Sequence, residues 1–439
     1  MHLYGGTVVQ LLHPGDGALR AVGADPALVE ALDLEFLSRG EGSALGVAST
    51  STDEGASPSM SDNMAQLTDR SGRRYASDQP RWRGDDKSPL MMEPLPGITR
   101  EQIDTGVNSQ WRYRAALPLP QADPVTLGEG RTPLLPRTFA GLHVAVKPES
   151  MNPTGSFKDR GSSVMITALR HQGIGQILED SSGNGGSSIA AYSAAAGIDA
   201  QIIAPASTSP TKIAQVRLHG AGVDLVPGSR QDVADEAIRR ADTRFYASHN
   251  WHPHFLQGIK LIAYEIWEDL GFTAPSAVLV PAGAGSLVLG CAMGFAELRR
   301  AGEIDQVPRI LVSQPEHCCP LVNALTGGDI AVEARTWPKT LAEGTAIAQP
   351  VRDREVLAAI RDSGGAATAV AEEELLPAVR ELARTGVFVE PTSAQVLPAL
   401  RQFHADGHIN PDDTVVLVLT GSGLKAGQAL SDFVNDVSP

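Results

Sequence analysis

The sequence feature that most constrains the fold is an alternation that begins near residue 140. Short apolar runs recur along the chain and are separated by segments long enough to form a helix. These runs are HVAVK (143–147), AQIIAP (200–205), AVLVPA (277–282), RILVSQ (309–314) and TVVLVLTG (414–421). Such runs are typical of strands buried on both faces, as in parallel sheets connected by helices. The pattern predicts an α/β fold with parallel-rich sheets.

Length and charge narrow the class of protein. A chain of 439 residues is long for one ordinary domain and can bury a sizeable core. Its 36 Lys and Arg against 51 Asp and Glu give a net charge of -15, which argues against a surface built to follow nucleic-acid phosphates. We therefore expect a globular enzyme with a small-molecule substrate and no nucleic-acid partner.

Cysteine usage and targeting signals favour a cytoplasmic location. Cys291, Cys318 and Cys319 have no metal-ligand spacing and make a poor disulfide framework. The N-terminus lacks a basic segment before an apolar run, and no later stretch reaches membrane-spanning length. We expect a protein of the reducing cytosol without a membrane partner.

The N-terminal region does not follow the alternating pattern. Residues 25–37 begin with Asp25 and Pro26 and have the apolar spacing of one short amphipathic helix. Residues 39–66 are rich in Ser, Gly, Thr and Asp, so they bury too little apolar surface to offset the entropy of ordering. They are predicted to form a mobile linker.

A single lysine follows a turn in NPTGSFKDR (152–160). Pro153 and Gly155 indicate a turn, and Lys158 precedes a helix predicted over about 159–171. A helix N-terminus disfavours a protonated amine, which would favour Lys158 as a neutral nucleophile. A surface lysine at a helix start explains the same stretch equally well.

Two glycine-rich loops follow strand-like segments. In SSGNGGSS (181–188), backbone N–H groups could converge on a carboxylate at a helix start, although a tight turn explains the glycines too. In PAGAGSLVLG (281–290), Val288 stands where a dinucleotide fingerprint needs its third glycine. That loop could hold one phosphate through main-chain amides or be a plain packing turn.

A reactive lysine, a carboxylate loop and a single-phosphate cup together suggest a pyridoxal phosphate site. The sequence here resembles the fold type II pyridoxal-phosphate enzymes, and among them threonine synthase and its close relatives. The resemblance extends from about residue 127 to the C-terminus. Its motifs are NPTGSFKDRG (152–161), SSGNGGSSIAAY (181–192), SHNWHPHFLQG (248–258), PAGAGSLVLG (281–290), VEPTSA (389–394) and LTGSGLK (419–425).

The resemblance implies a role for each matched position. Lys158 would form the Schiff base with the cofactor and take the α-proton, Asn184 would bind the cofactor's phenolic oxygen, and Thr420 would lie beside its pyridine nitrogen. A hydroxyl there, in place of Asp, leaves that nitrogen less protonated and favours loss of a β or γ substituent. The cofactor phosphate would be surrounded by Gly283, Ala284, Gly285, Ser286 and Leu287.

Substrate contacts are predicted from the same loops. The nest from Ser182 to Gly186, with Gly185 within it, could orient the α-carboxylate. Thr154, Ser156 and Arg160 are near Lys158 in sequence and are candidates for a substrate phosphate.

Two departures from the family pattern concern substrate and metal. Ser422 stands where threonine synthases commonly have His. Residues 67–90 resemble the cysteine-bearing ribbon of some relatives, but Thr68, Ser71, Gly84 and Lys87 occupy the cysteine positions, so no zinc site is predicted. If this segment folds, Tyr75, Trp82 and docking to the catalytic region must stabilise it. His249, His252 and His254 are interpreted as loop packing.

These expectations define the domains and the function. We expect an extension over residues 1–66, a ribbon-like segment over 67–98 and a catalytic region over 99–439, with a smaller subdomain at about 150–250. The leading hypothesis is conversion of O-phosphohomoserine to threonine and phosphate. Replacement on O-phosphoserine, a serine or threonine ammonia-lyase, and a non-catalytic cofactor-binding regulator remain open. The family is often dimeric, so a homodimer is possible.

Overall fold

The computed structural model describes residues 2–4, 7–12, 20–22, 65–119, 123–181, 183–208, 210–228 and 230–436. The chain divides into two compact units, Met1–Ser59 and Met60–Pro439. In the first unit, three strands form one antiparallel sheet: β1 (His2–Tyr4), β2 (Thr7–Leu12) and β3 (Arg20–Val22). The helix predicted over 25–37 and residues 39–64 of the predicted linker lie outside the described residues.

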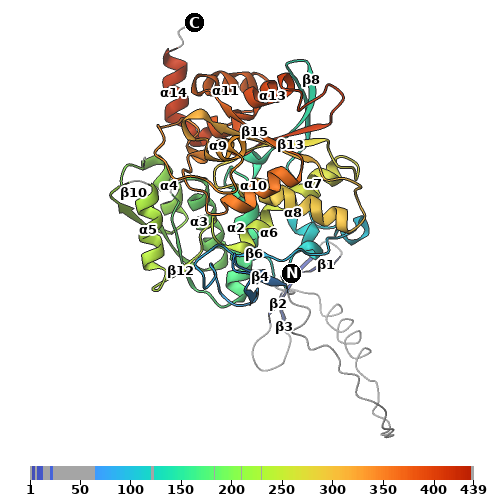
Figure 1. Cartoon of the computed structure of the whole chain (residues 1–439). Helices are drawn as coiled ribbons and strands as arrows, with labels where there is room; N and C mark the ends of the chain where they lie inside the picture. Colours follow the sequence, from blue (N-terminus) through green and yellow to red (C-terminus); the bar gives the residue numbers. More distant parts are fainter. Residues whose placement is uncertain are drawn as a thin grey trace. The chain divides into compact units, whose positions relative to one another are not determined.

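The larger sheet described in the second unit has six strands (Figure 1). Its order is β15-β14-β13-β16-β8-β7, and every neighbouring pair is parallel except β7 with β8. The strands are β7 (Leu135–Phe139), β8 (Leu142–Pro148), β13 (Ala277–Pro281), β14 (Arg309–Pro315), β15 (Ala366–Val370) and β16 (Val415–Leu419). The sheet confirms the strands predicted from four of the apolar runs.

A four-stranded parallel sheet lies within the residues predicted for the smaller subdomain. Its order is β11-β10-β9-β12. The strands are β9 (Gln176–Glu179), β10 (Asp199–Pro205), β11 (Gly222–Val226) and β12 (Phe245–Tyr246). The helices of this stretch are α2 (Lys158–His171), α3 (Asn184–Ala196), α4 (Pro210–Leu218) and α5 (Arg230–Arg240). Helices and strands alternate here as the apolar pattern predicted.

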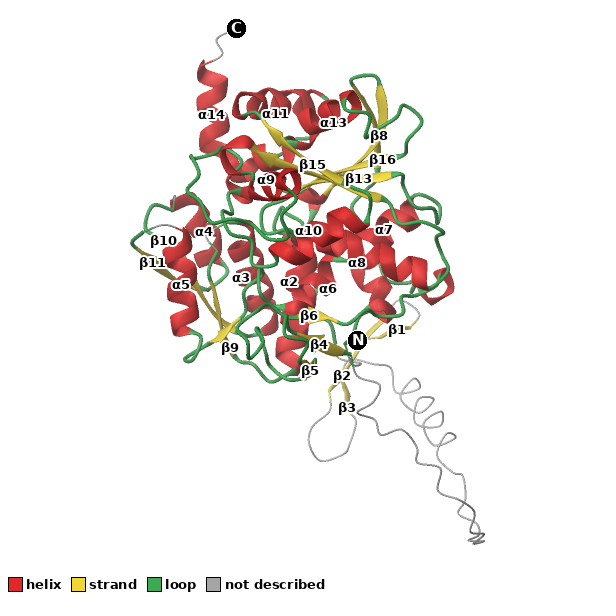
Figure 2. Cartoon of the chain, viewed as in Figure 1, coloured by secondary structure: helices red, strands yellow, loops and turns green. Residues whose placement is uncertain are grey.

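The other helices of the second unit surround the larger sheet or connect its strands (Figure 2). The α-helices are α6 (Pro253–Ile259), α7 (Leu261–Asp269), α8 (Ser286–Arg300), α9 (Pro320–Gly327), α10 (Asp353–Asp362), α11 (Leu375–Arg384), α12 (Pro391–Ala394), α13 (Val396–Ala405) and α14 (Gly427–Asp436). Short 3-10 helices are η2 (Arg100–Gln102), η3 (Gln110–Ala116), η4 (Glu149–Met151), η5 (Glu316–Cys318), η6 (Glu343–Thr345), η7 (Glu372–Glu374) and η8 (Gly423–Ala426). Within the described ranges, no helix is both long and apolar enough to cross a bilayer.

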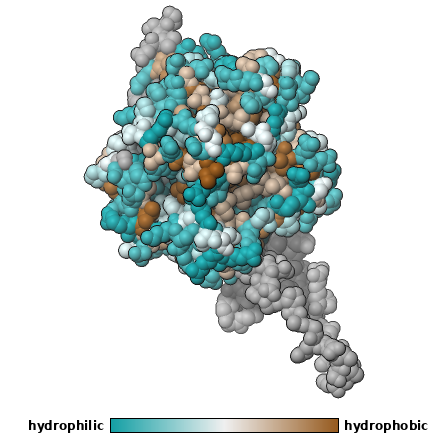
Figure 3. Space-filling model, viewed as in Figure 1, coloured by the Kyte–Doolittle hydropathy of each residue, from teal (hydrophilic) through white to brown (hydrophobic). Residues whose placement is uncertain are grey.

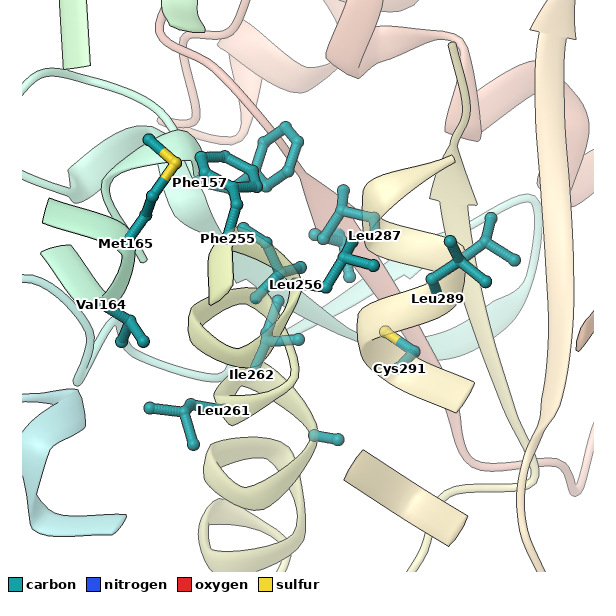
Figure 4. Close-up of a cluster of buried hydrophobic side chains, with 14 of the residues drawn as sticks. Phe157, Val164, Met165, Phe255, Leu256, Leu261, Ile262, Leu287, Leu289 and Cys291 are labelled. Carbon is teal, nitrogen blue, oxygen red and sulfur yellow. The ribbon is translucent and has the colours of Figure 1, made fainter. Parts of the chain in front are cut away.

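Helix α2 is central to the core and carries Lys158 at its first position. Its side chains are buried from Asp159 to Leu169, which is unusual for one helix and indicates that neighbours cover all its faces. A Cβ on Gly161 would lie 2.5 Å from the Phe255 ring, and one on Gly258 would lie 2.0 Å from the Arg160 carbonyl. Glycine on each helix therefore allows α2 and α6 to pack closely. Figure 4 shows Phe157 and Phe255 near each other in this apolar cluster.

The segment at 67–90 folds without cysteines. It forms the small antiparallel sheet β5-β4-β6, from β4 (Gln66–Thr68), β5 (Arg74–Ala76) and β6 (Met91–Met92). Asp69 accepts hydrogen bonds from the Ser71 hydroxyl at 2.7 Å and the Tyr75 hydroxyl at 2.6 Å. A Cβ on Gly84 would lie 2.5 Å from the Asp69 Cβ. The Asp69 carboxylate, with its hydrogen-bond donors, thus occupies the centre of the turn between β4 and β5.

Trp82 docks this segment onto the rest of the second unit. Its ring meets Tyr246 edge to face at 4.9 Å and Trp251 at 5.3 Å between centroids. Aromatic contacts of this kind stabilise an interface beyond the area that they bury.

Among the residues that the structure describes, no cluster of three or more His, Cys, Asp or Glu could hold a metal ion.

The surface drawn in Figure 3 is mostly hydrophilic, with apolar residues in small groups. Scattered apolar residues are ordinary on a folded protein. The space-filling view therefore gives no reason to assign a large apolar interface to this face.

Candidate active site

The turn before α2 is held against the carboxyl end of β16. The Phe157 N–H donates to the Thr420 carbonyl at 3.0 Å, and the Ser422 N–H donates to the Gly155 carbonyl at 3.0 Å. On the other side, the Glu390 N–H donates to the Gly421 carbonyl at 3.1 Å. Motifs far apart in sequence therefore meet where a strand of the larger sheet ends, which is the usual position of ligand sites in α/β sheets.

Lys158 is half-buried beside two aromatic rings. Its Nζ lies 4.7 Å from the centroid of Phe157 and 5.7 Å from that of Phe255. Burial, with the charge of Arg230 next, lowers the pKa of Lys158 to about 7, while Glu179 and Glu390 act in the opposite direction. A lysine with a lowered pKa is more often neutral at pH 7 than an ordinary one, which is the form that nucleophilic and basic roles require.

Asn184 begins α3 and faces the strand end across the site. Its Nδ2 donates to Glu390 Oε1 at 2.9 Å. An amide nitrogen has two hydrogens, so this bond orients the group and leaves one donor for another acceptor. A Cβ on Gly421 would lie 2.3 Å from Glu390 Oε1 and 3.0 Å from Asn184 Nδ2. Glycine is therefore required at 421, and Glu390 is a site residue that sequence reasoning missed although it lies in the VEPTSA motif.

The first turn of α3 has the close backbone approach expected of a carboxylate nest. A Cβ on Gly186 would lie 1.7 Å from the Ser181 carbonyl oxygen, and one on Gly185 would lie 2.8 Å from the His249 ring. These two positions therefore exclude side chains. The N–H groups of the first turn of a helix have no intrahelical acceptors, so those of α3 can bind another group. Ser182, the other predicted contact, in the loop before this helix, lies outside the described residues.

The loop before α8 forms a cup of small residues from Gly283 to Leu287. Gly285 has a φ of +83° and stands at the N-cap, which is a conformation that favours glycine. A Cβ on Gly283 would lie 2.9 Å from the Thr345 Cα. Ser286 and Leu287 open a helix of 15 residues, and Ala284 is half-buried between the glycines. Main-chain amides at such a helix start suit one phosphate group.

Two hydroxyls lie together at the end of β16. Thr420 Oγ1 shares a hydrogen bond of 2.8 Å with Ser393 Oγ, which also accepts from the Gly421 N–H at 2.8 Å. Both side chains are buried. The structure therefore places a hydroxyl pair, not a carboxylate, at the position predicted beside the pyridine nitrogen. Sequence reasoning missed Ser393, for which the VEPTSA motif was the available signal.

The predicted phosphate contacts near Lys158 have unequal surroundings. Thr154 donates to Asp159 through its N–H and its hydroxyl, both at 2.6 Å. Ser156 is completely buried, and its hydroxyl has no hydrogen-bond partner within the described chain. A buried hydroxyl without a partner is costly unless something binds it. Ser156 is thus the better placed of the two to meet a bound group.

Arg160 points into the core. Its guanidinium is fully buried and bonds Glu149 at 2.6 Å and Glu265 at 2.8 Å. A cation with two bonded carboxylates is already neutralised, so the structure gives Arg160 a structural partner set in place of the predicted contact with substrate phosphate. Proximity in sequence misled here, because the helix turns Arg160 away from the side that carries Lys158.

Lys425 is a second amine at the site that sequence reasoning did not single out. Its Nζ donates to Ser187 Oγ at 3.1 Å, and its Cε lies 3.2 Å from where a Cβ on Gly155 would be. Burial lowers its pKa, while Asp159 and Glu390 act to raise it. The LTGSGLK motif places this cation between the lysine turn and the first turn of α3.

The histidines have different environments. His252 and His254 are buried with ring centroids 5.4 Å apart, and burial lowers the pKa of His254 to about 4. His249 instead pairs with Glu179, its Nδ1 lying 2.6 Å from Oε1.

Cys318 and Cys319 are buried, and burial raises the pKa of each thiol. These cysteines therefore have little thiolate character.

Comparison with known proteins assigns the family. Residues 125–421 match the family of pyridoxal-phosphate dependent enzymes. The chain belongs to this family. It is a fold type II pyridoxal-phosphate enzyme of lyase type, and its cofactor is pyridoxal phosphate.

Threonine synthases are among the curated relatives of this chain, and solved structures share the fold. The relative from Methanosarcina acetivorans is 36% identical over 348 residues, or 77% of this chain and 85% of that protein. The relative from Methanocaldococcus jannaschii is 36% identical over 337 residues, covering 75% of this chain and 83% of that one. A threonine deaminase structure from T.th. has 27% identity and a TM-score of 0.58, and the match covers 67% of this chain and 92% of that one. These matches confirm the resemblance found in the motifs.

The described residues fit this cofactor. The amine of Lys158 lacks a bonded carboxylate in the described part of the chain, a Cβ on Gly283 or Gly285 would clash with neighbouring residues, and Asn184 keeps a donor beyond its bond to Glu390. The hydroxyl of Ser156 is buried without a partner. An aldehyde, a phosphate and a phenolic oxygen are the groups that such donors suit.

Proposed function

We propose that this protein is a threonine synthase, which converts O-phosphohomoserine to threonine and inorganic phosphate. The observation that carries the proposal is the turn that holds Lys158 at the end of β16, in a chain that aligns with threonine synthases over about three quarters of its length. The phosphorylated substrate and its specific contacts are part of this proposal.

Each site motif has a proposed part in holding the cofactor. Lys158 would bind its aldehyde carbon, Gly283 to Leu287 its phosphate, and Asn184 its phenolic oxygen. Thr420, supported by Ser393, would face the pyridine nitrogen. When bound, pyridoxal phosphate withdraws electrons from the α-carbon of an amino acid and so acidifies its proton. The amine of Lys158, with its pKa lowered to about 7, is suited to hold that proton at Nζ.

The substrate would be oriented by two groups of contacts. Gly185, Gly186 and the neighbouring amides would bind the α-carboxylate, with Ser182 as the contact predicted from sequence. Ser156, Thr154 and Lys425 would face the phosphate, with Lys425 in the place that the sequence had suggested for Arg160. One ammonium and a helix start can bind a phosphate dianion despite a net charge of -15, because distant charges are screened.

An ammonia-lyase is the second candidate. The threonine deaminase structure at 27% identity is the observation that favours it, and Ser422 at the substrate end would accompany such a change. An ammonia-lyase needs no phosphate contact, so the role of Lys425 distinguishes the two functions.

A substrate panel tests the proposal. Purified holoenzyme would be assayed with O-phosphohomoserine, O-phosphoserine with a nucleophile, serine and threonine, while phosphate, ammonia and new amino acids are measured. Threonine and phosphate in equal amounts from O-phosphohomoserine are expected. Ammonia from unphosphorylated serine or threonine alone would establish the lyase instead, and Lys158→Ala controls for a contaminating activity.

A further inference from the structure

Glu179 and His249 form a buried pair behind the loop that precedes α3. Glu179 is the last residue of β9, and His249 follows β12, the strand beside it. His249 Nδ1 lies 2.6 Å from Glu179 Oε1, and the His249 N–H donates to Glu179 Oε2 at 3.1 Å. Both oxygens of one carboxyl group are thus engaged by one histidine. Neither residue has a part in the chemistry proposed above.

The pair touches the site through Gly185. A Cβ on Gly185 would lie 2.8 Å from His249 Cε1 and 2.8 Å from its Nδ1, so the imidazole is packed against the backbone of this glycine. Glu179 and His249 are buried, with exposed fractions of 0% and 4%. A rigid, hydrogen-bonded ring under a loop fixes the direction of that loop's N–H groups.

Charge near the pair comes from several elements. Lys158 on α2 and Arg230 on α5 are the cations that face it, and Asp180 is the neighbouring acid. Asp180 accepts from the Ser248 hydroxyl at 3.1 Å and does not bond the pair. Burial raises the pKa of Glu179 to about 8, opposed by the His249 N–H, Lys158 and Arg230.

The histidine does not carry the charge at neutral pH. Burial, with Lys158 next, lowers the pKa of His249 well below its ordinary value. The pair therefore holds one proton between Oε1 and Nδ1 and is neutral overall at pH 7. When that proton leaves, an unneutralised carboxylate remains under the loop.

We infer that Glu179 and His249 are positioning residues for the substrate's α-carboxylate, and that the pair must keep its shared proton for this carboxylate to bind. The imidazole holds the first turn of α3 in place at Gly185. A negative charge on Glu179 would repel a carboxylate bound at the same loop through a poorly screened interior. The inference rests on the proposed role of this loop in binding the substrate.

Steady-state kinetics of the holoenzyme between pH 6.5 and pH 9.5 test the inference. In the wild type, the KM for O-phosphohomoserine should rise about tenfold above the pH at which Glu179 ionises, while kcat changes much less. In Glu179→Gln, which keeps a hydrogen-bonding group and cannot ionise, this alkaline rise should be absent. An unchanged alkaline rise in Glu179→Gln overturns the inference.

Two further variants assign the effect. Asp180→Asn removes the adjacent buried carboxyl group and should keep the alkaline rise, so loss of the rise there would move the assignment to Asp180. His249→Asn removes the contact with Gly185 but leaves Glu179, so KM should be several-fold higher at every pH and should still rise at alkaline pH. If only His249→Asn lost the rise, the titrating group would be His249 and the inference would be wrong.

A binding measurement separates this inference from the proposed function. L-threonine would be titrated into each holoenzyme while the visible cofactor band is followed, and its Kd should show the same alkaline rise in the wild type and none in Glu179→Gln. If O-phosphohomoserine is not turned over but this pattern holds, the proposed function fails and the inference stands. A Kd with the same pH dependence in both proteins overturns the inference whatever the substrate is.

Discussion

Two lysines near the same strand ends have opposite surroundings. Lys147 on β8 is fully buried and bonds Glu265 and Asp269, each at 2.7 Å. Lys158 on α2 is half-buried against aromatic rings and bonds no carboxylate within the described residues. Bonded carboxylates thus neutralise the charge of Lys147, which stabilises the fold. Lys158 has no such counter-charge among the described residues. Uncompensated burial is what lowers a lysine pKa, so the difference separates a structural amine from a reactive one.

The ion pairs around Lys147 show how bonded counter-charges offset the cost of burying charged groups. Burial alone would raise the pKa of Glu265, but Arg160 and Lys147 outweigh it and hold the pKa well below its ordinary value. Glu265 is therefore ionised at all ordinary pH values, and its stabilising effect is lost only as the pH falls far into the acid range. Arg160 belongs to this network, which is why we do not assign it to the substrate.

Replacing Lys158 should have the largest effect on activity. Lys158→Ala removes the nucleophile and base together, so kcat/KM should fall by at least about a thousandfold. Stability of the cofactor-free protein should change little, because the amine makes no ion pair in the described structure. Loss of the visible cofactor band, and of borohydride trapping on the peptide 152–160, would be measured beside a thermal melt. Trapping on another lysine would contradict the assignment.

Replacing Lys147 should instead have its main effect on stability. Lys147→Met leaves Glu265 with one fewer cation in a fully buried position, and breaking such a pair costs about 3–5 kcal/mol of unfolding free energy. Urea unfolding of the cofactor-free proteins measures this loss without the contribution of bound cofactor, with Lys158→Met as the matched substitution at the other amine. Similar losses of stability in the two variants would remove the distinction drawn between the two lysines.

Sequence reasoning predicted the elements of this fold because burial and turns leave local signals. The apolar run at 277–282 became β13, and the helix predicted over about 159–171, after the Pro-Thr-Gly turn, is α2, which begins at Lys158. That separate motifs serve one cofactor site was implied by the family resemblance. The roles of individual site residues stay predictions.

What the sequence could not predict depends on the direction of side chains in space. Arg160 is two residues from Lys158 and points away from it, whereas Lys425 is far away in sequence and contacts the same turn. Glu179 and His249 are joined only because β9 and β12 are neighbours in the sheet. No local pattern reports such pairing.

Replacing Lys425 tests whether this third amine acts in substrate binding and catalysis, as is proposed for Lys158, and not in stabilising the fold. Lys425→Met should raise the KM for O-phosphohomoserine by roughly 10–100-fold, because a hydrogen bond to a charged group is worth about 1.5–3 kcal/mol. Lys425→Arg should recover most of the loss. Binding of L-threonine, which has no phosphate, should be nearly unchanged, and an equal loss for both ligands would place Lys425 at the α-carboxylate instead.

The smallest predicted effect is also the most direct measure of the difference between the two lysines. Because the pKa of Lys158 is about 7, half of the amines are already neutral at pH 7. The rate at which the apoprotein recovers its cofactor band should therefore rise only about twofold from pH 7 to pH 9, whereas an ordinary lysine would show a rise of about a hundredfold. The reaction of Nα-acetyl-lysine with pyridoxal phosphate in the same buffers, divided by the roughly hundredfold rise of its own neutral amine, corrects for the cofactor's own titration. A corrected rise near a hundredfold would mean that Lys158 is an ordinary ammonium group and that its burial does not lower its pKa.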